Sequence, residues 1–227
     1  MTETILIVDD EAPMRSFVKR NLVARKYEVI EAKNGIEGLA MARHEDPDLV
    51  ILDIMMPHMD GYEMCRRLRA FSDVPVIVLT AMVDENEIVA ALDCGADDCL
   101  TKPFGVSELL ARVRSVLRRS HHKQQQGESK RITYRNLAVD ISANRAWIGD
   151  EELSLTRTEF TALRLYATNL GRTLPHSLVL STVWGEGYES ETHYVRIYVS
   201  RLRSKIEVDD GEPYFKTERG LGYRLGD

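Results

Sequence analysis

The stretch LVIL at residues 49–52 is a continuous apolar run that is followed by a carboxylate, Asp53. Other short, mostly apolar runs in the first half of the chain have the same form, and each is followed by a polar or charged residue: TILIV at 4–8 by Asp9 and Asp10, VPVIVL at 74–79 by Thr80, and DCLT at 98–101 by Lys102. Apolar runs without alternation are typical of parallel strands that are buried on both faces. The first half of the chain is therefore predicted to contain a parallel sheet.

Helical apolar spacing fills the segments between these runs. We predict helices over residues 12–25, 34–44, 61–70, 84–93 and 106–119, and one further strand over 27–32. Five strand–helix units in succession predict an α/β domain over residues 1–120. Its expected form is a five-stranded, doubly wound parallel sheet of the flavodoxin-like type, with helices on both faces.

The pattern changes after residue 120. Residues 121–130 (HHKQQQGESK) are polar and lack apolar periodicity, which is typical of a flexible linker. Short alternating stretches over 132–155 predict small antiparallel strands. Helices are predicted over 156–169, 177–184 and 192–207, and a hairpin over 214–225 that turns near Gly220. Thr156 and Glu159 match a capping box at the first of these helices. Residues 131–227 are thus expected to form an α+β winged helix-turn-helix domain.

The composition sets limits on the class of protein. The formal net charge is −6, and residues 1–120 account for it with 21 acids and 15 Lys or Arg, while the remaining residues carry 15 of each. Net charge alone therefore does not suggest nucleic-acid binding. No apolar run approaches the roughly 20 residues of a membrane span, and the start does not resemble a secretion signal, so we expect a cytoplasmic protein without a membrane partner. The three cysteines, Cys65, Cys94 and Cys99, show no CxxC spacing and are expected to be plain thiols.

Charged and hydroxyl side chains are predicted to meet at one edge of the parallel sheet. The carboxyl ends of parallel strands lie together and bind ligands there. The residues placed at that edge are Asp9, Asp10, Glu11, Asp53, Thr80 and Lys102. Clustered carboxylates suit Mg²⁺, and one of them could act as the nucleophile toward a phosphoryl group. The metal and Lys102 would neutralise the transferred oxygens, and Thr80 would donate a hydrogen bond. Each residue alone has an ordinary explanation as a turn or helix cap; the joint placement is specific.

Several motifs resemble the receiver domain of two-component response regulators, a CheY-like fold. They are VDDE at 8–11, LDIMMPHMDG at 52–61, LTA at 79–81 and TKPF at 101–104, and the similarity covers residues 3–120. The resemblance implies that Asp53 accepts a phosphoryl group from a sensor histidine kinase and that Lys102 contacts the phosphoryl oxygens. It implies that Asp10, Asp53 and the main-chain carbonyl of Met55 bind Mg²⁺ directly, and that Asp9 binds it through water. It also implies a cis peptide before Pro103.

Two positions depart from the receiver pattern. Cys99 stands where such receivers usually carry the Tyr or Phe that turns inward when the threonine engages phosphate, and Ile88 stands where a basic residue usually faces the dimer partner. The remaining residues of the charged dimer face match and are Asp97, Asp98, Glu108, Arg112 and Arg114. We expect Ile88 to leave Glu108 without its usual partner. We hypothesise that Cys99 weakens the aromatic switch and makes part of the activity independent of phosphate.

The helix over 192–207 has the pattern of a DNA-reading helix. A core-facing stripe is formed by Val195, Tyr198, Val199, Leu202 and Ile206. The residues predicted to face away are His193, Arg196, Ile197, Ser200, Arg201 and Ser204, flanked by Arg203 and Lys205. Guanidinium, hydroxyl and aliphatic groups read the base edges of the major groove. In the terminal hairpin, Lys216, Arg219 and Arg224 could reach phosphates or the minor groove. A solvated cationic helix is the plain alternative.

The second half of the chain also carries a family resemblance. LTRTEFTALRLY at 155–166, VWG at 183–185, RLRSKIE at 201–207 and TERGLGYRL at 217–225 resemble the effector domain of the OmpR/PhoB family, and residues 193–207 resemble regulators of potassium-uptake operons, the KdpE-like branch. The family implies a homodimer on activation, binding to direct repeats of double-stranded promoter DNA, and contact of the loop at 185–191 with RNA polymerase. Pro175 stands where the family often has a capping Ser or Thr.

These patterns favour a phosphorylation-controlled transcription factor over two alternatives. The first alternative is an atypical regulator with the same DNA-binding role and largely phosphate-independent control. The second is a Mg²⁺-dependent phosphohydrolase that uses an aspartyl phosphate; such enzymes need a second acid two residues after the nucleophile, where this chain has Met55. No GxxxxGK[ST] stretch supports ATP use.

Overall fold

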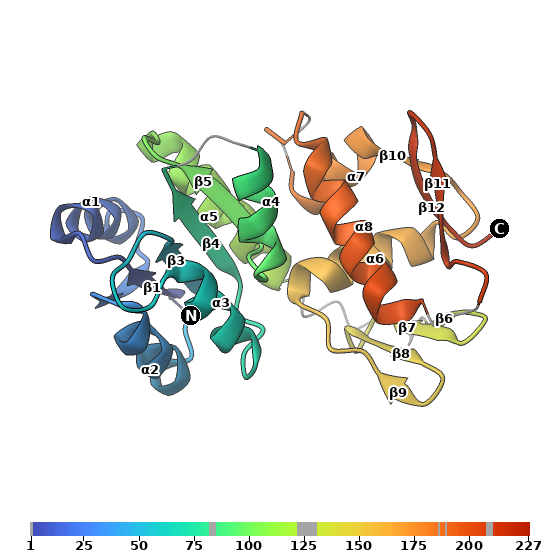
Figure 1. Cartoon of the computed structure of the whole chain (residues 1–227), viewed down its shortest axis with the longest axis horizontal. Helices are drawn as coiled ribbons and strands as arrows, with labels where there is room; N and C mark the ends of the chain where they lie inside the picture. The colour runs from blue at the N-terminus through green and yellow to red at the C-terminus, as the bar shows by residue number, and fades with distance from the viewer. Residues whose placement is uncertain (1, 82–84, 122–130, 186, 189, 208–210) are drawn as a thin grey trace. The chain divides into compact units, whose positions relative to one another are not determined.

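The computed structural model describes residues 2–81, 85–121, 131–185, 187–188, 190–207 and 211–227. The chain separates into two compact units, residues 1–120 and residues 121–227, and each is described by itself (Figure 1). Within the described residues, no helix is long and apolar enough to cross a lipid bilayer.

The first unit is built on a five-stranded parallel sheet, which confirms the predicted fold. The strands are β1 (Thr4–Val8), β2 (Glu28–Ala32), β3 (Leu49–Asp53), β4 (Val76–Thr80) and β5 (Asp98–Thr101). Their order across the sheet is β2-β1-β3-β4-β5, and every neighbouring pair is parallel. The chain reverses its direction of winding between β1 and β3, and this is the switch point at which α/β sheets bind ligands.

Five helices cover the two faces of this sheet. They are α1 (Ala12–Val23), α2 (Gly35–Glu45), α3 (Gly61–Arg69), α4 (Glu85–Asp93) and α5 (Val106–His121). The N-termini of α2 and α3 are each fixed by a side-chain cap: Asn34 accepts a hydrogen bond from the Glu37 amide, and Asp60 accepts one from the Glu63 amide. Such caps satisfy amides that have no partner within the helix. Both helices therefore begin at a fixed residue directly after a loop that leaves the sheet.

Alternate residues of each strand point into two separate apolar layers. On one side, Ile5, Ile7 and other strand residues pack against Val18 and Leu22 of α1 and against the apolar side of α5. On the other side, Leu6 and Val8 belong to a layer that includes residues of α2, α3 and α4. Figure 1 shows the helices arranged around this sheet. Burial on both faces explains why the strands are continuous apolar runs in the sequence.

The second unit has the strand and helix order of a winged helix. A four-stranded antiparallel sheet is formed by β6 (Arg131–Tyr134), β7 (Leu137–Asp140), β8 (Arg145–Ile148) and β9 (Glu151–Glu152). The helices are α6 (Arg157–Thr168), α7 (His176–Val183) and α8 (Thr192–Ile206). The terminal hairpin pairs β11 (Phe215–Glu218) with β12 (Gly222–Leu225), and the two-residue strand β10 (Leu174–Pro175) joins β12 on its other side. β10 was not predicted from the sequence.

Aromatic side chains fill the centre of the second unit. Trp184 at the end of α7 is fully buried and lies edge-on to Tyr198 of α8, with ring centroids 5.0 Å apart. Tyr166 of α6 and Phe215 of the hairpin are also edge-on, with centroids 5.0 Å apart. Edge-to-face pairs of this kind add stability beyond the area that they bury. They hold α6, α7, α8 and the hairpin together as one body.

The helix caps of the second unit follow the sequence. The predicted capping box is present: Thr156 accepts from the Glu159 amide, and Glu159 accepts from the Thr156 amide. Pro175 is the N-cap residue of α7 and makes no side-chain cap. The first amides of α7 therefore lack the cap that a Ser or Thr would provide.

Candidate functional site

An acidic pocket lies at the carboxyl edge of the parallel sheet, where β1 and β3 are neighbours. Asp53 is the last residue of β3 and is 3% exposed, and Asp9 follows β1 and is 0% exposed. Asp10 is exposed beside them. One carboxylate oxygen from each of the three lies within 4.8 Å of the others. Hard oxygen donors at this spacing, with one side open to water, are the ligands that Mg²⁺ prefers.

Lys102 compensates the charge of the two buried carboxylates. Its ammonium nitrogen lies 2.7 Å from Asp53 Oδ1 and 3.3 Å from Asp9 Oδ2. Burial acts to lower the pKa of Lys102, but the hydrogen bond to Asp53 and the negative charges of Asp53 and Asp9 outweigh it, so that the pKa is raised. Burial raises the pKa of Asp9, against the effects of a hydrogen bond from the Glu11 amide and of the Lys102 charge. The ammonium group is therefore kept charged at the position where a phosphoryl group would need neutralisation.

Arg15 is a pocket residue that the sequence analysis missed. Its guanidinium donates to the main-chain oxygens of Asp9, at 2.7 Å, and Asp10, at 3.0 Å. These bonds fix the backbone of the loop that carries both acids. Nothing in the position of Arg15, one turn into α1, points back to the loop before the helix. The two hydrogen bonds of Arg15 become evident only in the structure, because they depend on how α1 lies relative to the loop before it.

The other residues predicted for this site also lie at or near the carboxyl edge of the sheet. Thr80 is the last residue of β4 and is buried. Leu79 is in register with Asp53, so Thr80 lies one residue further along its strand than Asp53 does. The Lys102–Pro103 peptide is cis, as the resemblance implied. Met55 is 62% exposed, two residues after Asp53, and the use of its carbonyl as a metal ligand stays a prediction.

The loop that follows Asp53 approaches α3 closely. The Gly61 amide donates to the Ile54 oxygen at 3.0 Å. A Cβ atom added at Gly61 would lie 2.3 Å from the main-chain oxygen of Asp53. Only glycine permits this approach, which holds the end of β3 against the start of α3.

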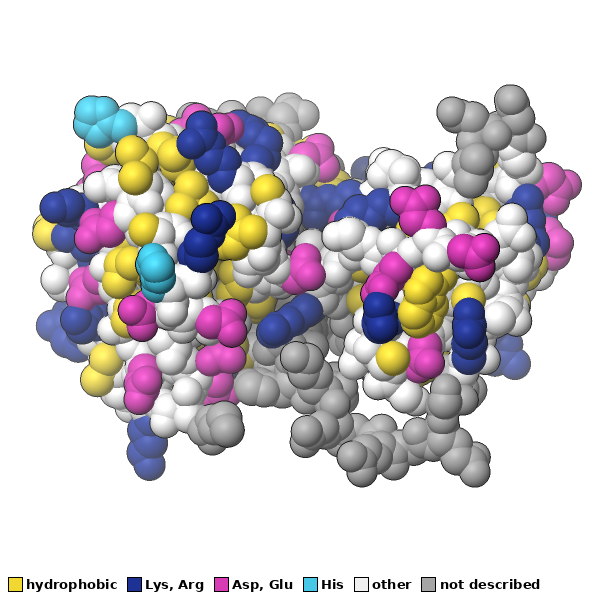
Figure 2. Space-filling view, turned by 90° about the horizontal axis from the view of Figure 1, so that it is seen from below, with side chains coloured by type: hydrophobic (Ala, Val, Ile, Leu, Met, Phe, Trp, Pro, Cys, Tyr) yellow, Lys and Arg dark blue, Asp and Glu magenta, His cyan; other side chains and the backbone are white. Residues whose placement is uncertain are grey.

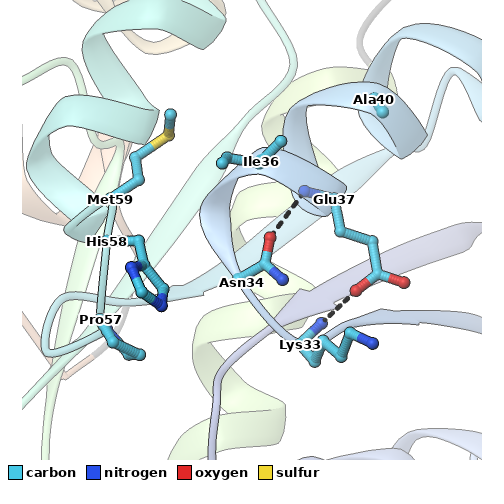
Figure 3. Close-up of a pocket in the computed structure, with 8 residues that line it drawn as sticks. All are labelled: Lys33, Asn34, Ile36, Glu37, Ala40, Pro57, His58 and Met59. Atoms are coloured by element: carbon cyan, nitrogen blue, oxygen red, sulfur yellow. Dashed lines mark hydrogen bonds between the residues drawn. The ribbon is translucent and has the colours of Figure 1, made fainter.

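A separate pocket of about 340 Å³ lies between the start of α2 and the same loop (Figure 3). Its lining residues are Lys33, Asn34, Ile36, Glu37, Ala40, Pro57, His58 and Met59. Figure 3 shows the capping bond of Asn34 and the bond from the Lys33 amide to the Glu37 carboxylate on the α2 side. None of the acidic-pocket residues lines it, so it is not the place where phosphoryl chemistry would occur.

The structure changes the interpretation of Asp97, which was expected on a charged dimer face. Asp97 is buried, its carboxylate lies 2.9 Å from Arg69 Nη2, and it accepts from the Val76 amide at 3.0 Å. Arg69 also donates to the main-chain oxygens of Gly95 and Val74. Asp97 therefore joins the end of α3 to the start of β4 inside the protomer.

Arg112 links two other residues of the expected dimer face. It lies 2.9 Å from Asp98 Oδ1 and 3.2 Å from Glu108 Oε1. Glu108 therefore has a partner one turn further along its own helix, while the expectation that Ile88 deprives it of its usual partner stays a prediction. Arg114 is exposed. Ile88 belongs to α4, and its side chain lies outside the part of the chain that the structure describes.

Cys99, at the position of the usual aromatic switch, is buried in β5. It belongs to the apolar layer between the sheet and the helices α2, α3 and α4. The thiol is small and lies in the core, so the group that would rotate at this position in other receivers is missing.

The helix α8 presents most of the predicted DNA-reading side chains to solvent. Arg196, Ser200 and Ser204 are exposed, and His193 and Arg201 are half-buried. The Arg201 guanidinium lies 5.0 Å from the centroid of the Tyr198 ring, which supports it from beneath. All five residues of the predicted core stripe are buried. Arg219, at the tip of the hairpin, is exposed.

Three residues of α8 have contacts within the second unit that the sequence did not predict. Ile197 was placed on the outer face but is 8% exposed and belongs to the core. Arg203 donates to the oxygen of Phe215 at 2.8 Å and to the Thr217 hydroxyl at 2.9 Å, so it ties the helix to the hairpin. Lys205 forms an ion pair with Glu159 of α6 at 2.6 Å. Ile197 therefore does not belong to the outer face of α8, while contact of Arg203 and Lys205 with DNA stays a prediction.

Acidic and basic side chains are interspersed over both units on the face that Figure 2 presents. This agrees with the equal numbers of acids and bases in the second half of the chain. DNA contact must therefore come from a local arrangement on α8 and the hairpin rather than from the charge of the whole domain.

A receiver sheet with an acidic carboxyl edge, followed by a winged helix with an open basic helix face, defines a two-component response regulator that binds DNA. The comparisons with known proteins agree. The family model "Response regulator receiver domain" matches residues 5–114, and "Transcriptional regulatory protein, C terminal" matches residues 150–225. The chain belongs to the OmpR/PhoB family of transcriptional response regulators.

Curated relatives match over nearly the whole chain. Response regulator MprA of Mycolicibacterium vanbaalenii is 43% identical, over 99% of this chain and 98% of its own length. The KDP operon transcriptional regulatory protein KdpE of Escherichia coli is 42% identical, over 97% of this chain and 98% of its own length. These near-equal identities do not separate a potassium-operon branch from others.

Solved structures match the fold over the same length. A mutant of RitR aligns over 99% of both chains with a TM-score of 0.80 and 27% identity. DrrB of Thermotoga maritima, described as an OmpR/PhoB homolog, covers 100% of both chains with a TM-score of 0.53 and 28% identity. Both similarities span the receiver and the winged helix together.

Proposed function

We propose that a sensor histidine kinase transfers a phosphoryl group to Asp53, and that this controls how α8 meets promoter DNA in the cytoplasm. The observation that carries the proposal is the position of Asp53: buried at the end of β3, 2.7 Å from the Lys102 ammonium group and within 4.8 Å of Asp9 and Asp10 oxygens. An Asp53 oxygen would attack the phosphorus, and the bond from phosphorus to the donor nitrogen would break.

Mg²⁺ fits the donor set of this pocket. Asp9, Asp10 and Asp53 supply clustered hard oxygens, and Asp10 is open to the water that magnesium retains. When bound, the ion neutralises charge on the phosphoryl oxygens. Lys102 neutralises it from the other side, and the buried Thr80 hydroxyl at the end of β4 donates a hydrogen bond to the product.

Intact-mass measurement after incubation with acetyl phosphate and Mg²⁺ tests the phosphorylation step. The wild type should gain one phosphoryl group, and chelation of Mg²⁺ should prevent the gain. Asp53→Asn should abolish it. Asp60→Asn is the matched control, because Asp60 caps α3 at an exposed position and an asparagine caps equally well. An Asp53→Asn protein that is still phosphorylated would remove the basis of the proposal.

We propose that α8 reads the major groove of direct-repeat DNA through Arg196, Ser200, Arg201 and Ser204, with Arg219 reaching the backbone. Exposed guanidinium and hydroxyl groups on one helix face support this reading. Arg201→Ala should lower the preference for the specific site over a mutated site by about 1–3 kcal/mol. Arg172→Ala removes an exposed arginine away from α8 and should leave the preference unchanged. Footprinting that finds the two variants equal would contradict the assignment.

Activation is proposed to bring two protomers together through the charged face of Asp98, Glu108, Arg112 and Arg114, with Ile88 on α4 beside it. The pair of Arg112 with Glu108, which is 49% exposed, supports a surface that responds to a charged partner, whereas Asp98, the other partner of Arg112, is fully buried. The loop at 185–191 is proposed to contact RNA polymerase. Sedimentation of the protein with and without acetyl phosphate tests the dimer, and an unchanged monomer after full phosphorylation would contradict it.

A second candidate is the same DNA-binding role with weak dependence on phosphate. The buried thiol of Cys99 supports it, since no aromatic ring at that position can rotate with Thr80. DNA affinity should then change little on addition of beryllofluoride, a phosphoryl mimic, and the change should grow in Cys99→Tyr. A large gain in the wild type, equal to that of Cys99→Tyr, would sink this candidate.

A further inference from the structure

The three cysteines, which are far apart in the sequence, share one apolar layer of the receiver. Cys65 lies on α3, Cys94 directly follows α4, and Cys99 lies in β5. All three are members of the core between the sheet and α2, α3 and α4. Their placement cannot be read from sequence spacing, which has no CxxC pattern.

Two of these thiols are in direct contact. The Cys65 thiol is hydrogen-bonded to Cys94, and the Cys94 sulfur is bonded to the Ala91 oxygen at 2.9 Å. A thiol has one proton to donate, so the Cys94 proton is directed at the Ala91 oxygen and the Cys94 sulfur accepts from Cys65. The bond to Cys94, together with burial, raises the pKa of the Cys65 thiol well above its ordinary value. Cys65 is thus held protonated against the sulfur of Cys94.

The contact is held in place by the structure around it. Arg69, one turn after Cys65 on α3, donates to the oxygen of Gly95 at 3.0 Å, and Gly95 is the residue after Cys94. The same guanidinium pairs with the buried Asp97. The segment that carries Cys94 is therefore fixed against the end of α3 independently of the thiols. The hydrogen bond between the two thiols brings the sulfurs together from these two fixed segments, which is the first requirement for a disulfide.

We propose that Cys65 and Cys94 form a redox-active dithiol, which hydrogen peroxide converts into an intramolecular disulfide that joins α3 to the end of α4. Cys94 is 7% exposed and Cys65 is 0% exposed, so the oxidant meets Cys94. This inference does not depend on phosphorylation of Asp53.

The steps balance as follows. The Cys94 sulfur attacks one oxygen of the peroxide, the O–O bond breaks, and a sulfenic acid and one water form. The Cys65 sulfur then attacks the Cys94 sulfur, the S–O bond breaks, and the departing hydroxide takes the Cys65 proton as a second water. One peroxide is reduced and two thiols are oxidised. Because the thiols are buried and protonated, the reaction is slow and needs a sustained excess of oxidant.

The experiment treats the full chain with hydrogen peroxide, quenches it with N-ethylmaleimide under denaturing conditions, and measures the intact mass. The expected product has lost two hydrogens, alkylates at Cys99 alone, and gives a Cys65–Cys94 cross-linked peptide that dithiothreitol cleaves. Asp53→Asn should behave as the wild type does, which separates this inference from the phosphorylation proposal.

The variants sharpen the test. Cys65→Ser and Cys94→Ser should each abolish the cross-link, whereas Cys99→Ser should retain it. Core serines can prevent folding, so the peptide map of the wild type decides the matter alone. A map that shows Cys99 in the cross-link, a disulfide between two chains, or oxidation of Cys94 to sulfinic acid without a cross-link would overturn the proposal.

Discussion

The ammonium group of Lys205, on α8, lies 2.6 Å from the carboxylate of Glu159, in the first turn of α6. Glu159 is 3% exposed, and the same carboxylate also accepts from the Thr156 amide. Lys205 further donates to the oxygen of Ser154 at 2.8 Å. One buried carboxylate thus closes the capping box of α6 and fixes the end of α8 against it. Lys205, which was predicted to flank the outward face of α8, thus also connects α8 to α6.

Replacing Lys205 with alanine should therefore destabilise the second unit. The substitution leaves the Glu159 carboxylate buried without its cation, at a cost on the order of 2 kcal/mol. Both tryptophans, Trp147 and Trp184, lie in the second unit, so their fluorescence during urea unfolding reports on it selectively. Lys216→Ala is the control, because its ion pair with Asp227 is at the surface. An unfolding midpoint equal to that of Lys216→Ala would show that the buried pair contributes nothing.

Gly61→Ala should distort the loop that follows Asp53. The added Cβ would lie 2.3 Å from the Asp53 oxygen and 2.8 Å from the Ile54 Cα, and both are backbone atoms that cannot move alone. We expect destabilisation of about 1–3 kcal/mol from overpacking, and slower phosphorylation by acetyl phosphate because the Asp53 carboxylate shifts.

The matched control for this change is Gly105→Ala. A Cβ at Gly105 would meet nothing within 4 Å. Thermal melting of the receiver by circular dichroism and the rate of phosphoryl incorporation should both match the wild type there. If Gly61→Ala behaves in the same way, the close approach of α3 to Asp53 does not matter for the site.

Arg203→Ala should loosen the hairpin from α8. The guanidinium donates to the Phe215 oxygen and the Thr217 hydroxyl, and its loss should cost the second unit about 1.5–3 kcal/mol. Hydrogen exchange should quicken in β11 and β12 and stay unchanged in the receiver. Thr217→Val removes only one of the two bonds and should have a smaller effect. Equal hydrogen-exchange rates in Arg203→Ala and Thr217→Val would contradict the role of the Arg203–Phe215 bond in holding the hairpin against α8.

Acid should weaken the second unit through His176. Burial, and then the charge of Arg196, lowers the pKa of His176, which also lies edge-on to Tyr223. The unfolded chain binds the proton near the ordinary pKa of about 6.5, so stability is complete above that pH and is lost as the pH falls toward the lowered value. Tryptophan-monitored unfolding at a series of pH values should show this loss.

Two histidine variants isolate the effect. His176→Gln should flatten the pH dependence, because the titrating group is gone. His44→Gln, at an exposed position on α2, should leave it as in the wild type. A pH dependence that persists undiminished in His176→Gln would assign it to another group.

The receiver could be predicted almost completely because its chemistry sits at the ends of buried strands. The strands at Thr4–Val8 and Asp98–Thr101 agree with prediction to the residue. A polar residue at the carboxyl end of a strand that is buried on both faces lies at the carboxyl edge of the sheet. Asp9 and Asp53 are therefore at the same edge whatever the conformation of the loops. The contact of Cys65 with Cys94 could not be predicted, because it depends on how α3 and the end of α4 lie side by side.

For α8, helical periodicity alone does not predict every side chain that is buried. A helical wheel gives the direction of a side chain from its own axis, and it assigned the core stripe of α8 correctly. It does not say what packs beside the stripe, so Ile197 was placed in solvent although it is buried. The partners of Arg203 and Lys205 come from segments that the local pattern does not include.

Arg112 already shares its charge between Asp98 and Glu108 within one protomer. A second protomer that offers a carboxylate would exchange one ion pair for another rather than create a new one. The electrostatic gain on association is then the small difference between similar contacts. The proposed dimer would therefore gain little from these ion pairs and would separate readily once phosphorylation is reversed.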